Sequence, residues 1–87
     1  MNLWVDRLQP PPDGWVWAQS SSGAIDALSL GEIERLSLDY ELGGNDTTYL
    51  VVCWMRENRM WLREICVHCA NPVCAKWLAG MIDRYRE

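Results

Sequence analysis

Short hydrophobic runs alternate along the chain with longer segments in which hydrophobic residues recur every three or four positions. The short runs are rich in aromatic and β-branched residues, which favour strands. They predict strands over residues 3–5, 15–18, 33–38 and 65–69. Residues 9–14 are a glutamine, three prolines, an aspartate and a glycine, which predicts a stiff connection between the first two strands.

Three longer segments predict helices. Serines at 20–22 offer an N-cap and Gly31 a stop, which together predict a short helix over residues 23–30. Apolar residues at 50, 51, 54 and 55 predict a second helix over residues 47–58, after a loop at 43–46 that offers an N-cap. Asn71 and Pro72 begin the last helix, whose apolar positions 74, 77, 78, 81, 82 and 85 follow helical spacing.

The predicted order is therefore β-β-α-β-α-β-α, in one domain over residues 1–87. Strands that alternate with helices indicate an α/β fold with a small, mainly parallel four-stranded sheet and three helices. Functional groups in such sheets gather beyond the carboxyl ends of the strands. We expect three polar segments to meet there: Asp6-Arg7, Asp39-Tyr40-Glu41 and His68-Cys69-Ala70-Asn71.

Composition limits the classes of function. A net charge of −4 argues against nucleic acid as a ligand, which would need a basic face. No apolar run is long enough to span a membrane, and the first residues lack the basic start of a signal peptide. We therefore expect a cytoplasmic protein whose four cysteines are reduced. Six tryptophans in 87 residues exceed what so small a core can hide, which indicates a contact surface for a protein partner.

Four stretches resemble a known family in order and spacing. They are Leu-Trp-Val-Asp-Arg-Leu-Gln-Pro at 3–10, Asp-Gly-Trp at 13–15, Ser-Leu-Asp-Tyr-Glu-Leu-Gly at 37–43 and Val-His-Cys-Ala-Asn-Pro at 67–72. Together they resemble the small bacterial cyclic-phosphate processing receiver family, miniature relatives of response-regulator receiver domains. The resemblance covers nearly the whole chain and implies a truncated receiver-like, flavodoxin-like fold.

The resemblance also implies an activity, namely the metal-assisted handling of a phosphate ester. If the chain is such an enzyme, Asp6, Asp39 and Glu41 would hold Mg²⁺, while His68 and Asn71 would act on the phosphate. The family pattern has two adjacent acidic residues after the first strand and an arginine before the proline. It then has Asp-His-Asp-Leu-Gly and His-Ser-Ala-Asn-Pro. This chain departs from that pattern at Arg7, Gln9, Tyr40, Glu41 and Cys69.

The most consequential departure is Arg7, which puts a positive charge where the family has a carboxylate. Two unit charges about 4 Å apart repel by about 4 kcal/mol at an effective dielectric constant of about 20. A guanidinium here therefore opposes a bound cation, unless its side chain points away from the site, and it can pair with Asp6, Asp39 or Glu41 instead. Gln9 replaces the arginine that could hold a phosphate with two hydrogen bonds, and Tyr40 replaces the histidine that could carry a proton. Together these changes indicate an eroded site, in which His68 braces the junction of strand and helix.

Other interpretations of single residues remain open. Cys66, His68, Cys69 and Cys74 have the residue types of a zinc site, although residues three apart on a strand point to opposite faces. Cys69, at the start of the last helix, has the position of an activated nucleophile. Surface carboxylates can mimic nucleic-acid phosphate. Phosphorylation of Asp39, as in a signalling receiver, would need a lysine at the edge of the sheet. Lys76 does not meet this need, because it lies inside the last helix.

Our leading hypothesis is a non-catalytic receiver-like protein-binding module that needs no cofactor. It would be a regulator or inhibitor that docks on a macromolecular complex, such as a phage or mobile-element protein directed against bacterial defence. Tryptophan and arginine are favoured at such interfaces. The candidate partner-binding residues are Trp15, Trp17, Arg59, Trp61 and Arg63. The alternative is a metal-dependent phosphoesterase that processes cyclic phosphates with Mg²⁺.

Overall fold

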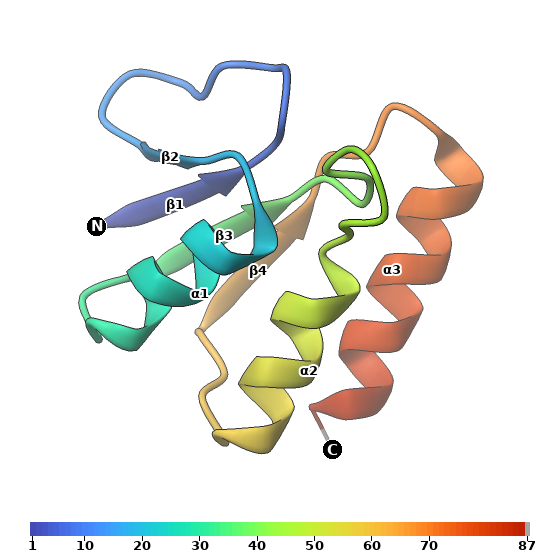
Figure 1. The fold of residues 1–87 in the computed structure, drawn as a ribbon. Helices are drawn as coiled ribbons and strands as arrows, with labels where there is room; N and C mark the ends of the chain where they lie inside the picture. Colours follow the sequence, from blue (N-terminus) through green and yellow to red (C-terminus); the bar gives the residue numbers. More distant parts are fainter. Residues whose placement is uncertain (87) are drawn as a thin grey trace.

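The computed structural model describes residues 1–86, in which four strands and three helices follow in the predicted order (Figure 1). The elements are β1 (Asn2–Val5), β2 (Val16–Ala18), α1 (Ser21–Ser29), β3 (Arg35–Leu38), α2 (Tyr49–Glu57), β4 (Glu64–Val67) and α3 (Pro72–Tyr85). The strands form one sheet in the order β2-β1-β3-β4, and all three pairings are parallel. The predicted α/β class with a four-stranded parallel sheet is confirmed.

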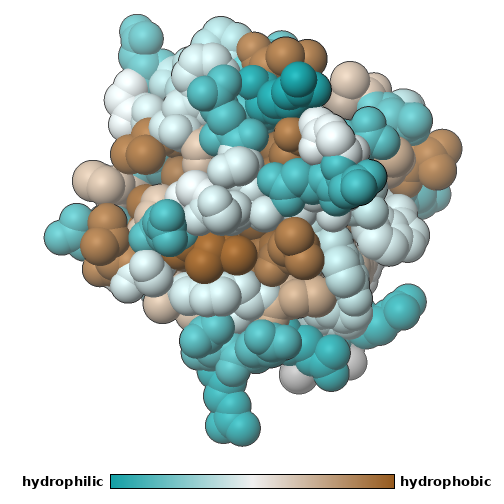
Figure 2. Space-filling model, viewed as in Figure 1, coloured by the Kyte–Doolittle hydropathy of each residue, from teal (hydrophilic) through white to brown (hydrophobic). Residues whose placement is uncertain are grey.

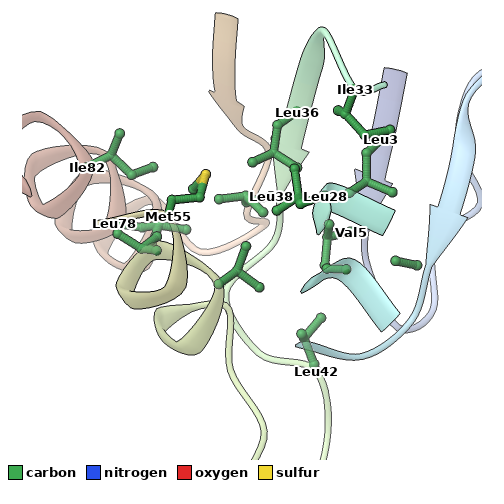
Figure 3. Close-up of a cluster of buried hydrophobic side chains, with 14 of the residues drawn as sticks. Leu3, Val5, Leu28, Ile33, Leu36, Leu38, Leu42, Met55, Leu78 and Ile82 are labelled. Atoms are coloured by element: carbon green, nitrogen blue, oxygen red, sulfur yellow. The ribbon is translucent and has the colours of Figure 1, made fainter. Parts of the chain in front are cut away.

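The hydrophobic core lies between one face of the sheet and the three helices (Figure 3). Alternation along each strand sends Leu3 and Val5 of β1, and Leu36 and Leu38 of β3, to this face, where all four are fully buried. The helices meet them with a second set of buried side chains: Ala24, Leu28, Val51, Val52, Met55, Leu78, Met81 and Ile82. Each fully buried valine, leucine, isoleucine or methionine side chain contributes about 1.5–3 kcal/mol to the stability of the folded chain. The core therefore fixes which sheet face is turned inward.

The opposite face of the sheet carries no helix. In register across the four strands lie Trp17, Trp4, Ser37 and Cys66. Trp4 is only half-buried, and the ring of Trp15 packs edge-on against it, with centroids 6.0 Å apart. The connection from β1 to β2, residues 6–15, contains no helix that would cover this face (Figure 1). This face of the sheet therefore has no layer of helices over it.

Caps explain where two of the helices begin. The Ser20 side chain accepts a hydrogen bond from the Gly23 amide, so α1 starts at Ser21 rather than Gly23. Asn71 accepts one from the Val73 amide, with Pro72 in the first turn of α3, as predicted. The expected side-chain cap from the 43–46 loop to the second helix is absent. The Asp46 carboxylate instead accepts hydrogen bonds from the amide and hydroxyl of Ser21, and so ties this loop to α1.

Among residues 1–86, no helix is both long enough and apolar enough to cross a membrane.

The start of α2 offers a test of polar burial. Thr48 is completely buried, and its hydroxyl has no hydrogen-bond partner among the described residues. A buried, unpaired hydroxyl is destabilising, so Thr48→Val should raise the free energy of unfolding by about 1 kcal/mol. Thr48→Ser keeps the hydroxyl, loses the methyl group and should lower that energy. Urea denaturation followed by circular dichroism measures both changes, and an unstable Thr48→Val protein would contradict this account.

Candidate functional site

The carboxyl ends of β1, β3 and β4 meet around a cavity of about 330 Å³. It is lined by Asp6, Arg7, Leu8, Gln9, Asp39, Glu41, Gly43, His68 and Ala70. The structure therefore brings together four of the residues expected at the site, Asp6, Asp39, Glu41 and His68. Asn71 does not line the cavity, because it lies one residue further on and caps α3.

Asp6 is the most buried charged residue of the site, with 4% of its surface exposed. One carboxylate oxygen, Oδ1, accepts hydrogen bonds from the amides of Leu8 and Gln9, both at 2.9 Å. The other, Oδ2, lies 3.1 Å from Nε2 of His68. Both oxygens are thus engaged inside the protein, and they hold the loop after β1 against the end of β4.

His68 is held on three sides. Its Nδ1 lies 2.6 Å from the hydroxyl of the buried Ser37, and its Nε2 donates to Asp6. Its ring stacks on Trp4, with centroids 3.8 Å apart and planes 9° from parallel. A carboxylate can only accept, so Nε2 carries a hydrogen, and Nδ1 accepts from Ser37 whenever the ring is neutral. These contacts match the bracing role that the sequence suggests for His68.

Two tryptophan N–H groups secure the same loop. Nε1 of Trp4 donates to the Gln9 carbonyl at 2.8 Å, and Nε1 of Trp17 donates to the Asp6 carbonyl at 2.7 Å. Phenylalanine is smaller and has no N–H group, so it would leave both carbonyls without these donors. Some of the tryptophans that the composition assigns to a contact surface therefore have a structural role.

Arg7 does not form the ion pair expected of it. Among the described residues no carboxylate lies within 4.0 Å of its guanidinium, and the carboxylate of Asp6 contacts His68 instead. The Arg7 side chain lies over Gly43, where a Cβ atom would come within 2.8 Å of Arg7 Cζ. The prediction of an Arg7 pair with Asp6, Asp39 or Glu41 is wrong: Asp6 is engaged by His68 and the loop amides, and the Arg7 side chain packs on Gly43 rather than on Asp39 or Glu41.

Asp39 lies beside the thiol of Cys69. Its Oδ1 accepts a hydrogen bond from the Tyr40 amide at 2.8 Å. Partial burial, reinforced by the negative charge of Asp39, raises the pKa of Cys69 from 9.0 to about 11. Since the thiolate is the reactive form, Cys69 is a poor nucleophile at neutral pH, and the alternative of an activated thiol is disfavoured.

The donor set does not suit the Mg²⁺ that the family resemblance implies. Mg²⁺ needs free, hard oxygen ligands in near-octahedral geometry. Asp6 is bound by two amides and an imidazole, and the Arg7 guanidinium lines the same cavity. Residues 1–86 contain no group of three or more His, Cys, Asp or Glu side chains placed to share a metal ion, which also leaves the zinc alternative without a ligand set.

The five residues predicted to bind a partner do not form one surface. Trp15 and Trp17 belong to the β2 edge, while the others lie in the loop before β4, at the other edge of the sheet. Trp61 packs against the core, and Arg59 and Arg63 are exposed but line different cavities. The sequence prediction passed over Trp77, which is 50% exposed. Its position in the apolar stripe of the last helix suggested burial. That stripe is wider than the part of the helix that contacts the core, so one side of the stripe stays exposed.

The Asp39–Cys69 contact predicts a pH-dependent reactivity. Asp39→Asn removes a nearby negative charge, so it should lower the pKa of Cys69 and speed its alkylation by iodoacetamide severalfold at mildly alkaline pH. The folded state holds this thiol proton more tightly than the unfolded chain does. The resulting stabilisation is present below pH 9.0 and is lost as the pH rises towards 11.

Fragmentation mass spectrometry can locate each alkylated cysteine, with the exposed thiol of Cys66 as the internal reference. An unchanged ratio of Cys69 to Cys66 alkylation in Asp39→Asn would contradict the assigned role of the carboxylate.

Comparison with known proteins agrees with the architecture of the chain. The family model described as the cyclic-phosphate processing receiver domain matches residues 1–84. Searches of curated proteins and of solved structures found no match. Since the family model covers almost the whole sequence, the chain belongs to the cyclic-phosphate processing receiver domain family.

Proposed function

We propose that this chain is a non-catalytic receiver-like module that acts by binding another protein. The observation that carries the proposal is the state of Asp6, whose two carboxylate oxygens are occupied by two main-chain amides and by His68. In the family pattern the neighbouring position carries a second carboxylate, and here it carries Arg7. The charges at this strand end therefore stabilise the loop rather than a bound cation.

Exposed aromatic and aliphatic side chains supply the means of binding. Trp17 is 40% exposed, Trp77 is 50% exposed and Val73 is 76% exposed. Tryptophan is enriched at the centres of protein interfaces, because it buries a large area at a small cost in conformational entropy. A chain of 87 residues that leaves two tryptophans this exposed has surface that a partner can cover.

A small module of this kind can regulate another protein by binding to it. Without a reaction of its own, it changes the activity of that partner by covering part of the partner's surface. We include in the proposal the role of a regulator or inhibitor of a macromolecular complex, of which a phage or mobile-element protein directed against bacterial defence is one setting.

Restoring the acidic residue tests the loss of metal chemistry. The parental chain should bind Mg²⁺ only weakly and should not hydrolyse 2′,3′-cyclic nucleotides with Mg²⁺, Mn²⁺ or Zn²⁺. Arg7→Asp replaces repulsion by attraction, so it should strengthen Mg²⁺ binding by about one to three orders of magnitude in isothermal titration calorimetry. Arg63→Asp makes the same charge change at the other end of the sheet and should leave Mg²⁺ binding unchanged.

Tight Mg²⁺ binding by the parental chain, abolished by Asp39→Ala, would overturn the proposal. So would turnover of a cyclic nucleotide that is lost in His68→Ala, which would favour the metal-dependent phosphoesterase.

A further inference from the structure

A second and larger cavity lies away from the strand ends. It measures about 540 Å³ and runs along α3, beneath Tyr40 and beside the start of α2. It is lined by Tyr40, Tyr49, Lys76, Trp77, Gly80, Met81, Arg84 and Tyr85, which we call the α3 groove. Four of these eight residues are aromatic, and Trp77 meets Tyr40 edge-on with centroids 5.3 Å apart. The groove therefore offers an aromatic lining to a ligand.

The charge of the α3 groove is opposite to that of the chain. Its two charged lining residues, Lys76 and Arg84, are both basic, whereas the chain carries a net charge of −4. No carboxylate among residues 1–86 lies within 4.0 Å of either cation. Arg56 adds a third positive charge at the edge, over the ring of Tyr85 at 4.7 Å. This charge pattern complements an acidic ligand.

Gly80 leaves an open space on the surface of α3. It lies in the interior of the helix, where glycine is less stable than alanine. Nothing lies within 4 Å of the position that a Cβ atom would take there, so packing inside the chain does not require glycine. A missing side chain between Trp77 and Arg84 leaves room for the backbone or a side chain of a partner helix.

The spacing along α3 indicates the shape of the ligand. Lys76 and Arg84 are eight residues apart, which is about 12 Å along a helix axis. Trp77 and Gly80 lie between them on the same stretch of helix. A second helix packed along α3 would place two of its own carboxylates at this separation, with an apolar residue midway over the aromatic floor.

On the face drawn in Figure 2, hydrophobic surface occurs as separate brown areas among teal hydrophilic ones. Apolar area alone does not single out one docking region there. The α3 groove is distinguished by the combination of aromatic lining, unopposed basic charge and the glycine gap.

We propose that the α3 groove binds an acidic amphipathic helix of a partner protein, with an apolar side chain over Trp77 and carboxylates paired to Lys76 and Arg84. This inference rests on the proposed protein-binding function and names the surface and the chemistry of the partner. The cavity at the strand ends takes no part in it.

Three synthetic helical peptides of about 18 residues test the proposal by fluorescence anisotropy. The first carries a central leucine with glutamates four positions before and after it. The second replaces those glutamates by lysines, and the third replaces the leucine by alanine. The first peptide should bind the intact chain at low salt, weaken as salt is added, and bind about tenfold more tightly than either of the others.

Variants of the chain locate the binding site. Trp77→Ala and the double variant Lys76→Glu/Arg84→Glu should each weaken binding of the first peptide by about tenfold or more. Leu30→Ala changes an exposed apolar residue outside the groove, and it should leave binding unchanged. Circular dichroism establishes that each variant is folded.

Gly80→Ala separates binding from stability. It should raise the melting temperature of the free chain by about 3–6 °C, because alanine is the better helix former. It should nevertheless weaken binding of the first peptide severalfold, because its methyl group fills the gap. A variant that is more stable and binds less well cannot be explained by damage to the fold.

Four outcomes would overturn the proposal: no preference for the acidic peptide over the lysine peptide, equal binding by the Trp77→Ala chain, self-association that Trp77→Ala abolishes, or displacement of the peptide by ATP or a short RNA. None of these outcomes alters the Mg²⁺ and turnover measurements. Failure of the α3 groove as a peptide site is therefore distinguishable from failure of the non-catalytic function.

Discussion

The contact between Asp6 and His68 is the constraint on which the strand-end cavity depends. It joins residues 62 positions apart and binds the end of β1 to the end of β4 across the intervening β3. A buried carboxylate is costly unless its oxygens are satisfied, and here three donors satisfy them. The same imidazole is fixed by Ser37 and by stacking on Trp4. Removal of either partner would leave a buried polar group unpaired and release the loop after β1.

This arrangement bears on the chemistry that the family name implies. A carboxylate whose two oxygens are both engaged inside the protein has little freedom to coordinate a cation. Arg7 adds a positive charge to the same cavity and rests on Gly43, where any larger residue would displace it. The fold of a cyclic-phosphate processing receiver domain is retained here, and in its strand-end cavity the buried Asp6 contacts His68.

The one-sided packing of the helices determines which surfaces of the chain stay exposed. Three helices cover one face of the sheet, and the other face is shielded only in part by Trp4 and Trp15. On the helical side, α3 turns Leu78, Met81 and Ile82 to the core and leaves Trp77 half-exposed over the α3 groove. An apolar stripe wider than its contact with the core therefore produces a surface suited to recognition.

The sequence by itself determined the order of elements, the α/β class and the gathering of polar residues at the strand ends. These follow from local rules: hydrophobic periodicity, the Asn71-Pro72 helix start and the common direction of parallel strands.

Which charges pair and which aromatic residues stay exposed became known only from the folded chain. From the sequence, Arg7 could pair with any of several carboxylates. In the folded chain the residue that contacts Asp6 is His68, which is far from it in sequence. The sequence assigned Trp61 to a partner surface and Trp77 to the apolar stripe of the last helix, but Trp61 packs against the core and half of Trp77 is exposed. Pairing and exposure depend on three-dimensional proximity, which a local pattern of residues does not encode.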